Sequence, residues 1–199
     1  MQIRRRGLVG LGALLTLGAM VVLLTTLASA ASSSSAQHVR WDIIGSTGVP
    51  APIIPGGHAS ATAPDGDTIT LTGFGHFVAP ASGGGSAAVD GGGTWTTSSG
   101  GAGTYEVTAL VSWENAGAQT LPPAVIDNID EGTATNGVAV LKIAFSDGKQ
   151  GVLTVGCHGP GAPPGIFEGI ATTKGFKTYY TVQPPSPGVV GNRTIFHVR

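Results

Sequence analysis

Apolar and polar residues alternate along residues 68–77, and this is the clearest pattern in the chain. One parity carries apolar residues and two glycines, namely Ile69, Leu71, Gly73, Gly75 and Phe77. The other parity carries three threonines, Phe74 and His76. Strict alternation is typical of a β-strand with one buried face. The Gly-Phe-Gly centre predicts a bend or bulge where a long strand curves.

A second alternation runs through residues 104–113, TYEVTALVSW. The odd positions from Tyr105 to Trp113 are apolar, and the even positions are polar except for Leu110. Because side chains of a strand alternate between its two faces, we expect the odd positions to face the core. Core packing is accordingly the interpretation of Trp113.

Shorter segments complete the expected secondary structure. Apolar stretches predict strands at 38–44, around Trp95 and at 193–198. Glycine, proline and serine predict connections at 45–57, where there are three prolines, at the Gly/Ser-rich stretch before Trp95, and at 115–136. The last connection holds the sequence PAVIDNI, for which we expect one helical turn.

Residues 138–157 predict a β-hairpin around the sequence Ser-Asp-Gly-Lys. A two-residue turn at Asp147-Gly148 would place Leu141 opposite Thr154, an apolar residue against a polar one. An odd loop over 147–149 instead matches the apolar faces, with the pairs Phe145–Gly151, Ile143–Leu153, Leu141–Val155 and Ala139–Cys157. Since a slip of one residue turns a strand inside out, the pattern predicts a bulged three-residue turn.

Residues 166–182 fit either a helix or two strands. Phe167 and Ile170 have helical spacing, but the glycines, threonines and tyrosines favour two strands with a bend at Lys174-Gly175. We therefore predict strands. Whether Glu168 is solvated or buried depends on which residues face the core. If Phe167 faces the core, Glu168 is solvated; if Ile170 does, Glu168 is buried, and a buried carboxylate needs a partner.

The first thirty residues have the pattern of a cleavable signal peptide. Three arginines precede an apolar run at 8–27, and Ala-Ser-Ala ends the segment. The alternative is a retained anchor, because twenty apolar residues are long enough to span a bilayer. Either way we expect the folded part, a flexible leader at 31–37 and a single β-domain at 38–199, to lie outside the cytoplasm.

Composition narrows the class of the exported part. Three of the ten basic residues and none of the eleven acidic ones lie in the signal segment, so the remainder is net acidic. Its basic residues are scattered, which argues against nucleic acid as a partner. The single cysteine excludes an internal disulfide. With 41% hydrophobic residues, 11% charged residues and 33 glycines, the chain is suited to short strands and tight turns rather than to disorder.

The adjacent Cys157 and His158 raise the question of a catalytic thiol. Neighbours on a strand point to opposite faces, so this pair cannot form a thiolate–imidazole contact, and a catalytic cysteine would need His76 or His197 from elsewhere. We expect Cys157 to be a buried structural thiol and His158 to point outward.

The other candidate side chains are weaker signals. The five histidines lack the spacing of a metal site, so we predict neither a metal nor a cofactor. Trp95 lies among threonines and serines and is the better candidate, compared with Trp113, for an exposed platform that stacks a ligand such as a sugar.

Residues 141–176, LKIAFSDGKQGVLTVGCHGPGAPPGIFEGIATTKGF, resemble a group of exported microbial proteins with no assigned activity. The shared features are an SDG turn, a strand that ends in CH, and the sequences FEGI and TKG; the earlier segments GGGTWT and GTYEVTALVSW are also similar. The resemblance spans roughly residues 69–180. It implies no chemistry, but it draws attention to the polar positions Cys157, His158, Glu168 and Lys174.

Together these patterns predict an all-β fold, either an antiparallel β-sandwich or a small closed β-barrel of about eight to ten strands. The leading hypothesis is a secreted, non-catalytic β-domain that binds an unknown ligand or a cell-surface component. The alternatives are an extracellular enzyme with a site at the barrel mouth near His158, Glu168 and Lys174, and a purely structural surface protein. The pocket candidates are Cys157, His158, Glu168, Lys174, His76 and Trp95.

Overall fold

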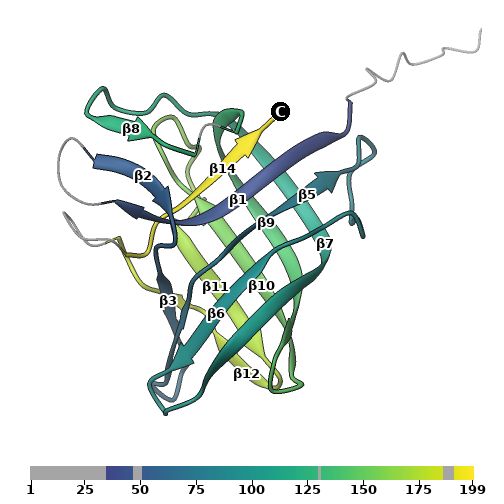
Figure 1. Cartoon of the computed structure of the whole chain (residues 1–199), viewed down its shortest axis with the longest axis vertical. Coiled ribbons are helices and arrows are strands. Elements are labelled where there is room, and N and C mark those ends of the chain that lie inside the picture. Colours follow the sequence, from purple (N-terminus) through teal and green to yellow (C-terminus); the bar gives the residue numbers. More distant parts are fainter. Residues whose placement is uncertain (1–34, 47–50, 130, 186–190) are drawn as a thin grey trace, which may run out of the picture. The chain divides into compact units, whose positions relative to one another are not determined.

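The computed structural model describes residues 35–46, 51–129, 131–185 and 191–199, and every regular element within these ranges is a β-strand (Figure 1). The predicted all-β class is confirmed. The expected signal peptide, residues 1–30, lies outside the described residues, as does most of the expected leader, whose last residue Gln37 already belongs to the first strand. The described residues contain no helix that is long and apolar enough to cross a membrane.

The described part of the chain contains fourteen strands. In chain order they are β1 (Gln37–Ser46), β2 (Ala51–Pro55), β3 (Ala59–Thr62), β4 (Thr68–Leu71), β5 (Phe74–Ala79), β6 (Gly92–Thr97), β7 (Ala102–Ala118), β8 (Val125–Asp127), β9 (Thr133–Phe145), β10 (Gln150–Cys157), β11 (Gly169–Lys174), β12 (Lys177–Tyr179), β13 (Thr181–Val182) and β14 (Thr194–Val198). The number exceeds the expected eight to ten because several strands have only two to five residues.

Six strands close into an antiparallel barrel, in the order β1, β5, β6, β7, β9, β14 and back to β1. Strands β10, β11 and β12 extend the sheet from β9, and strands β4, β3 and β13 extend it from β6. Only Tyr180 separates β12 from β13, so the segment 177–182 connects the two extensions. Between the two predicted architectures, the chain therefore adopts the barrel.

The alternation at residues 68–77 is confirmed, and a glycine marks the predicted bend. Strand β4 ends at Leu71 and pairs with β3 and β6, whereas β5 begins at Phe74 and pairs with β1. Gly73 between them has a φ of 148°, and a Cβ atom there would lie 2.5 Å from the carbonyl oxygen of Gly92. A side chain at this position would clash with the backbone of β6.

The predicted facing of β7 is correct at its start and again at Trp113, which lies opposite Ala139 and packs against the rings of Phe77 and Phe196 as expected, but it is wrong between the two bulges. Tyr105 and Val107 face the core, but the register of β7 against β9 shifts between Val107 and Ala109 and again between Leu110 and Ser112. Each bulge inserts one residue and moves the inward parity. Leu110, the apparent exception, is therefore buried, and Val111 is 38% exposed.

The β9–β10 hairpin has the predicted parity and loop length but a different register. The amide of Phe145 donates to the carbonyl of Lys149 at 2.8 Å, so the three-residue loop is 146–148, and its glycine has a φ of 84°. Leu153 lies opposite Leu141, two residues from the predicted partner. A displacement of two residues keeps each side chain on its face, which is why the apolar sides still meet.

Two segments expected as connections contain strands. Strand β2 pairs with β1 and, in parallel, with β8, which replaces the expected helical turn. The reason is tertiary: Ile53 of β2 is buried against Ile44 and Ile195 on the outer side of the barrel strands. A second, smaller apolar cluster forms there and stabilises both short strands.

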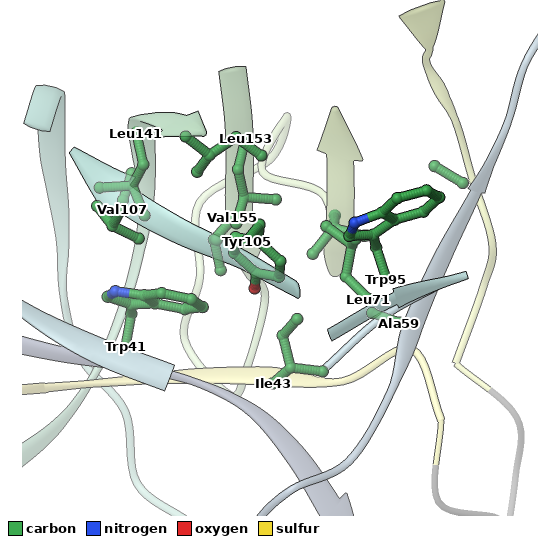
Figure 2. Close-up of a cluster of buried hydrophobic side chains, with 14 of the residues drawn as sticks. Trp41, Ile43, Ala59, Leu71, Trp95, Tyr105, Val107, Leu141, Leu153 and Val155 are labelled. Carbon is green, nitrogen blue, oxygen red and sulfur yellow. The ribbon is translucent and has the colours of Figure 1, made fainter. Parts of the chain in front are cut away.

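The main core consists of inward side chains from the six barrel strands and from the strands that extend the sheet, among them β4 and β10 (Figure 2). Trp41, Ile43, Leu71, Leu141 and Leu153 are fully buried in it. Burial of a large apolar side chain stabilises a fold by about 1.5–3 kcal/mol. The two strands predicted within residues 166–182 are present as β11 and β12. They pair with each other and bend at Gly175, as expected.

Candidate functional site

Four hairpin turns lie at the lower end of the barrel in Figure 1, and residues of all four turns and their flanking strands line one pocket. They join β3 to β4, β6 to β7, β9 to β10, and β11 to β12. The pocket has a volume of about 270 Å³, and its lining residues are Asp67, Trp95, Thr97, Ser99, Gly101, Asp147, Lys149, Lys174, Lys177 and Tyr179. We call it the four-turn pocket. Loops held by a rigid scaffold are a common position for binding groups.

Lys174 is the inward-facing cation of the four-turn pocket. It follows Ile170 and Thr172 on the buried face of β11, and its side chain is only 6% exposed. Its ammonium group donates to the carboxylate of Asp147 and lies 3.9 Å from the centre of the Trp95 ring. A buried lysine needs a partner of opposite charge, and here a turn residue of the neighbouring hairpin supplies it.

Asp67 ties three of the four turns together. Its carboxylate accepts hydrogen bonds from the Ser98 hydroxyl at 2.8 Å and from the Ser99 amide at 3.0 Å. It also accepts from the Lys177 ammonium and the Tyr179 hydroxyl, both at 3.0 Å. The wall of the pocket is therefore preorganised, which lowers the entropic cost of binding.

Titration behaviour follows from these contacts. The hydrogen bonds from Lys177 and Ser98 hold the pKa of Asp67 well below its usual range. Burial, together with the hydrogen bond to Asp67, raises the pKa of Tyr179 to about 12. The hydrogen bond from Lys174 lowers the pKa of Asp147. These carboxylates are therefore ionised at neutral pH.

The expectation that Trp95 is exposed is wrong. Trp95 is 4% exposed, its ring meets the edge of Phe145 at 5.8 Å between centroids, and its indole N–H donates to the carbonyl of Thr104 at 3.1 Å. Glycines make this burial possible: a Cβ atom at Gly101 or Gly103 would lie within 2.9 Å of the indole. The ring thus forms the floor of the four-turn pocket, beneath Lys174.

Cys157 and His158 lie at the other end of β10, as the hairpin pattern predicted. Cys157 is 2% exposed, and burial raises the pKa of its thiol to about 12. The Gln119 amide lies 3.4 Å from its sulfur atom. His158 is exposed, and its Nδ1 atom lies 2.8 Å from the carbonyl oxygen of Ile166. The predicted burial of Cys157 and the predicted outward position of His158 are both confirmed.

Glu168 is engaged with backbone amides rather than with His158 or Lys174 side chains. Its two carboxylate oxygens accept from the His158 amide at 2.6 Å and from the Thr194 amide at 2.7 Å. Ile170 is the inward residue, so the alternative with a partnered Glu168 is the one observed. Burial raises the pKa of this carboxyl. Glu168 precedes β11 and Lys174 ends it, so the expected group of His158, Glu168 and Lys174 is not assembled.

His76 belongs to a separate hollow of about 180 Å³ on the outer side of β1 and β5. Its ring nitrogens lie 2.9 Å from Asp90 and 3.3 Å from Glu131, and Glu131 also contacts Arg40. Arg40 in turn binds the fully buried Asp42 through two nitrogens. These contacts form a continuous chain of hydrogen bonds and ion pairs from Asp90 to Asp42. Within the described ranges, no group of three or more potential ligands could hold a metal ion.

Sequence reasoning did not single out four residues of the four-turn pocket: Asp67, Asp147, Lys177 and Tyr179. A partial signal existed, because Asp67 and Asp147 both lie beside glycines, which is typical of turns, although only the turn at Asp147 was predicted. Which turns meet depends on the strand order around the barrel. That order cannot be read from local patterns.

Comparison of the chain with protein-family models, curated proteins and solved structures finds no match. The resemblance to exported microbial proteins therefore stays a prediction. The site must be interpreted from its own geometry.

Proposed function

We propose that this chain is an exported, non-catalytic β-barrel that binds a small neutral ligand rich in hydroxyl groups, such as a sugar, in the four-turn pocket. The supporting observation is the balance of charge at the pocket. Its three lysines are paired with three aspartates: Lys149 and Lys174 with Asp147, and Lys177 with Asp65 and Asp67.

The pairing disfavours a charged ligand. An anion would have to displace an aspartate from a lysine, and a cation would have to displace a lysine, so each would break an existing ion pair. A hydroxyl group both donates and accepts, and it can join an ion pair without separating it. Ligands with several hydroxyl groups therefore fit this lining best.

Accessible groups for such contacts remain at the rim. The side chains of Lys149, Lys177 and Asp147 are 57%, 38% and 32% exposed. The hydroxyls of Thr97 and Ser99 lie 3.1 Å apart on the β6–β7 turn. The volume of about 270 Å³ lies just below the roughly 300–1,000 Å³ of pockets for drug-sized ligands. One sugar ring is an appropriate size.

The enzyme alternative has lost the group of residues that defined it. Glu168 is occupied by two backbone amides, His158 contacts a carbonyl, and Lys174 lies at the far end of β11. The four-turn pocket contains no histidine or cysteine among its lining residues. Binding is therefore the function that the geometry favours.

The test is titration of the purified protein with a panel of neutral monosaccharides, with backbone amide NMR shifts as the readout. We expect saturable shifts at Lys149 and Asp147, and we expect Lys149→Ala to weaken binding about threefold to tenfold because a charged group contributes about 1 kcal/mol or more to a hydrogen bond. The matched control is Lys142→Ala, an exposed lysine on β9 outside the pocket.

Two results would count against this function. One is the absence of saturable shifts with every sugar of the panel. The other is equal affinity of the wild type and the Lys149→Ala variant, which would place any binding elsewhere. In the first case the purely structural hypothesis would take its place.

A further inference from the structure

Phe176 is the most exposed large apolar side chain of the described residues, at 108% of its reference area. It lies at the tip of the β11–β12 hairpin, directly after Gly175, whose φ of 60° makes the tight turn. Polar residues and glycine are the usual choice at such a tip. A phenylalanine as exposed as this one buries no apolar surface within the fold, so its ring is accessible to another molecule.

The hairpin tip is also the rim of the four-turn pocket. Lys174 and Lys177, two residues before and one residue after Phe176, both line that pocket, as does Tyr179. Tyr180, which follows, is 65% exposed. Aromatic side chains thus continue from the pocket onto the surface of the same hairpin.

We infer that the binding site extends from the four-turn pocket onto Phe176, and that the ligand is a linear oligosaccharide rather than a single sugar. This inference rests on the proposed function. One sugar ring occupies the pocket, and the next ring stacks its C–H face on the phenyl ring. A phenyl ring has no polar atom, so its contribution is apolar contact, and its two side-chain torsions keep the entropic cost of ordering it low.

An exposed aromatic beside two lysines is also a feature of membrane-binding surfaces. Here the lysines are already neutralised: Lys177 lies 2.8 Å from Asp65 and 3.0 Å from Asp67, and Lys174 binds Asp147. Ammonium groups held in this way cannot attract anionic headgroups strongly. A saccharide, which needs no net positive charge, agrees better with these contacts.

The experiment compares glucose, galactose, mannose and N-acetylglucosamine with the linear tetrasaccharide of each, by calorimetric titration of the purified protein. We expect one tetrasaccharide to bind about tenfold more tightly than its monosaccharide, and Phe176→Ser to remove that advantage without changing the affinity for the monosaccharide. The control is Ile126→Ser, which replaces a 53% exposed side chain on β8, outside the pocket.

The outcomes separate the two proposals. Unchanged tetrasaccharide affinity in Phe176→Ser, with monosaccharide binding still sensitive to Lys149→Ala, overturns the extension and leaves the proposed function standing. Failure of every saccharide to bind overturns both. Binding to phosphatidylserine-containing vesicles that Phe176→Ser abolishes would overturn the saccharide extension in favour of a membrane surface.

Discussion

The ammonium group of Lys174 lies 3.9 Å from the centre of the Trp95 ring and contacts the carboxylate of Asp147. A cation is thus held between an aromatic floor and an anionic turn at the end of an otherwise apolar interior. Cation–π contacts contribute about 0.5–2 kcal/mol, depending on how far the pair is removed from water. Both the aliphatic stem and the charge of Lys174 can therefore contribute to stability, and substitutions can separate the two contributions.

Lys174→Met should preserve the free energy of unfolding within about 1 kcal/mol, because methionine fills the volume of the stem and Asp147 stays hydrated at 32% exposure. Lys174→Ala should be less stable than Lys174→Met by about 2 kcal/mol, because it leaves a cavity above Trp95. Urea denaturation measures both. The same pair of substitutions at exposed Lys142 is the control, and equal losses in both Lys174 variants would show that charge, not packing, dominates.

The buried thiol of Cys157 should make the protein less stable at alkaline pH. Its pKa is raised from 9.0 to about 12 in the folded state, so its stabilising contribution is complete below pH 9 and is lost as the pH rises toward 12. In that window the unfolding free energy of the wild type should fall relative to Cys157→Ala by up to about 1.4 kcal/mol per pH unit.

Chemical denaturation at pH 7, 8, 9 and 10.5 checks the alkaline prediction, with the difference between wild type and Cys157→Ala constant from pH 7 to 8 as the internal control. A chromogenic disulfide reagent should label the thiol at pH 7 only after unfolding. Rapid labelling of the folded protein would contradict the inward position of Cys157.

Replacement of Glu168 by glutamine should destabilise the protein by about 1–3 kcal/mol. The carboxylate accepts from the amides of His158 and Thr194, and a glutamine side chain has only one acceptor oxygen, so one of these amides would lose its partner. Thermal and urea denaturation measure the loss. As a control, Glu114→Gln, at an exposed position of β7, should change stability by less than about 0.5 kcal/mol. A similarly small effect of Glu168→Gln would show that the two hydrogen bonds from backbone amides to Glu168 contribute little to stability.

The hydroxyl of Tyr179 should ionise at about pH 12, because burial and the hydrogen bond to Asp67 both raise its pKa. Phenolate absorbance recorded against pH follows this step, and Tyr179→Phe identifies it. Asp67→Asn removes the anionic acceptor and should lower the midpoint, whereas Asp65→Asn, which has no hydrogen bond to Tyr179, should lower it less. An unchanged midpoint in Asp67→Asn would mean that burial alone sets the pKa.

Local patterns were sufficient to predict the buried face of a segment where its apolar residues alternate regularly. The alternation around Leu71 predicted the buried face and the glycine bend, although the expected single long strand is divided into β4 and β5, and the parity of the β9–β10 hairpin placed Cys157 inside. Local patterns failed where a neighbouring strand changed the outcome. The bulges that turn Leu110 inward arise from the fit of β7 to β9, and Trp95 is buried because two glycines let a turn close over it.

The β class, the inward parity of several strands and the burial of Cys157 could be predicted from local patterns, because alternation is a property of each strand alone. The closure of the sheet into a barrel and the meeting of four turns around Lys174 depend on which strands pair with one another. Asp67, Asp147 and Lys177 come from three different hairpins, and their contacts depend on strand order around the barrel. Contacts between distant segments leave no periodic trace in any one of them, so the pocket became visible only in the folded chain.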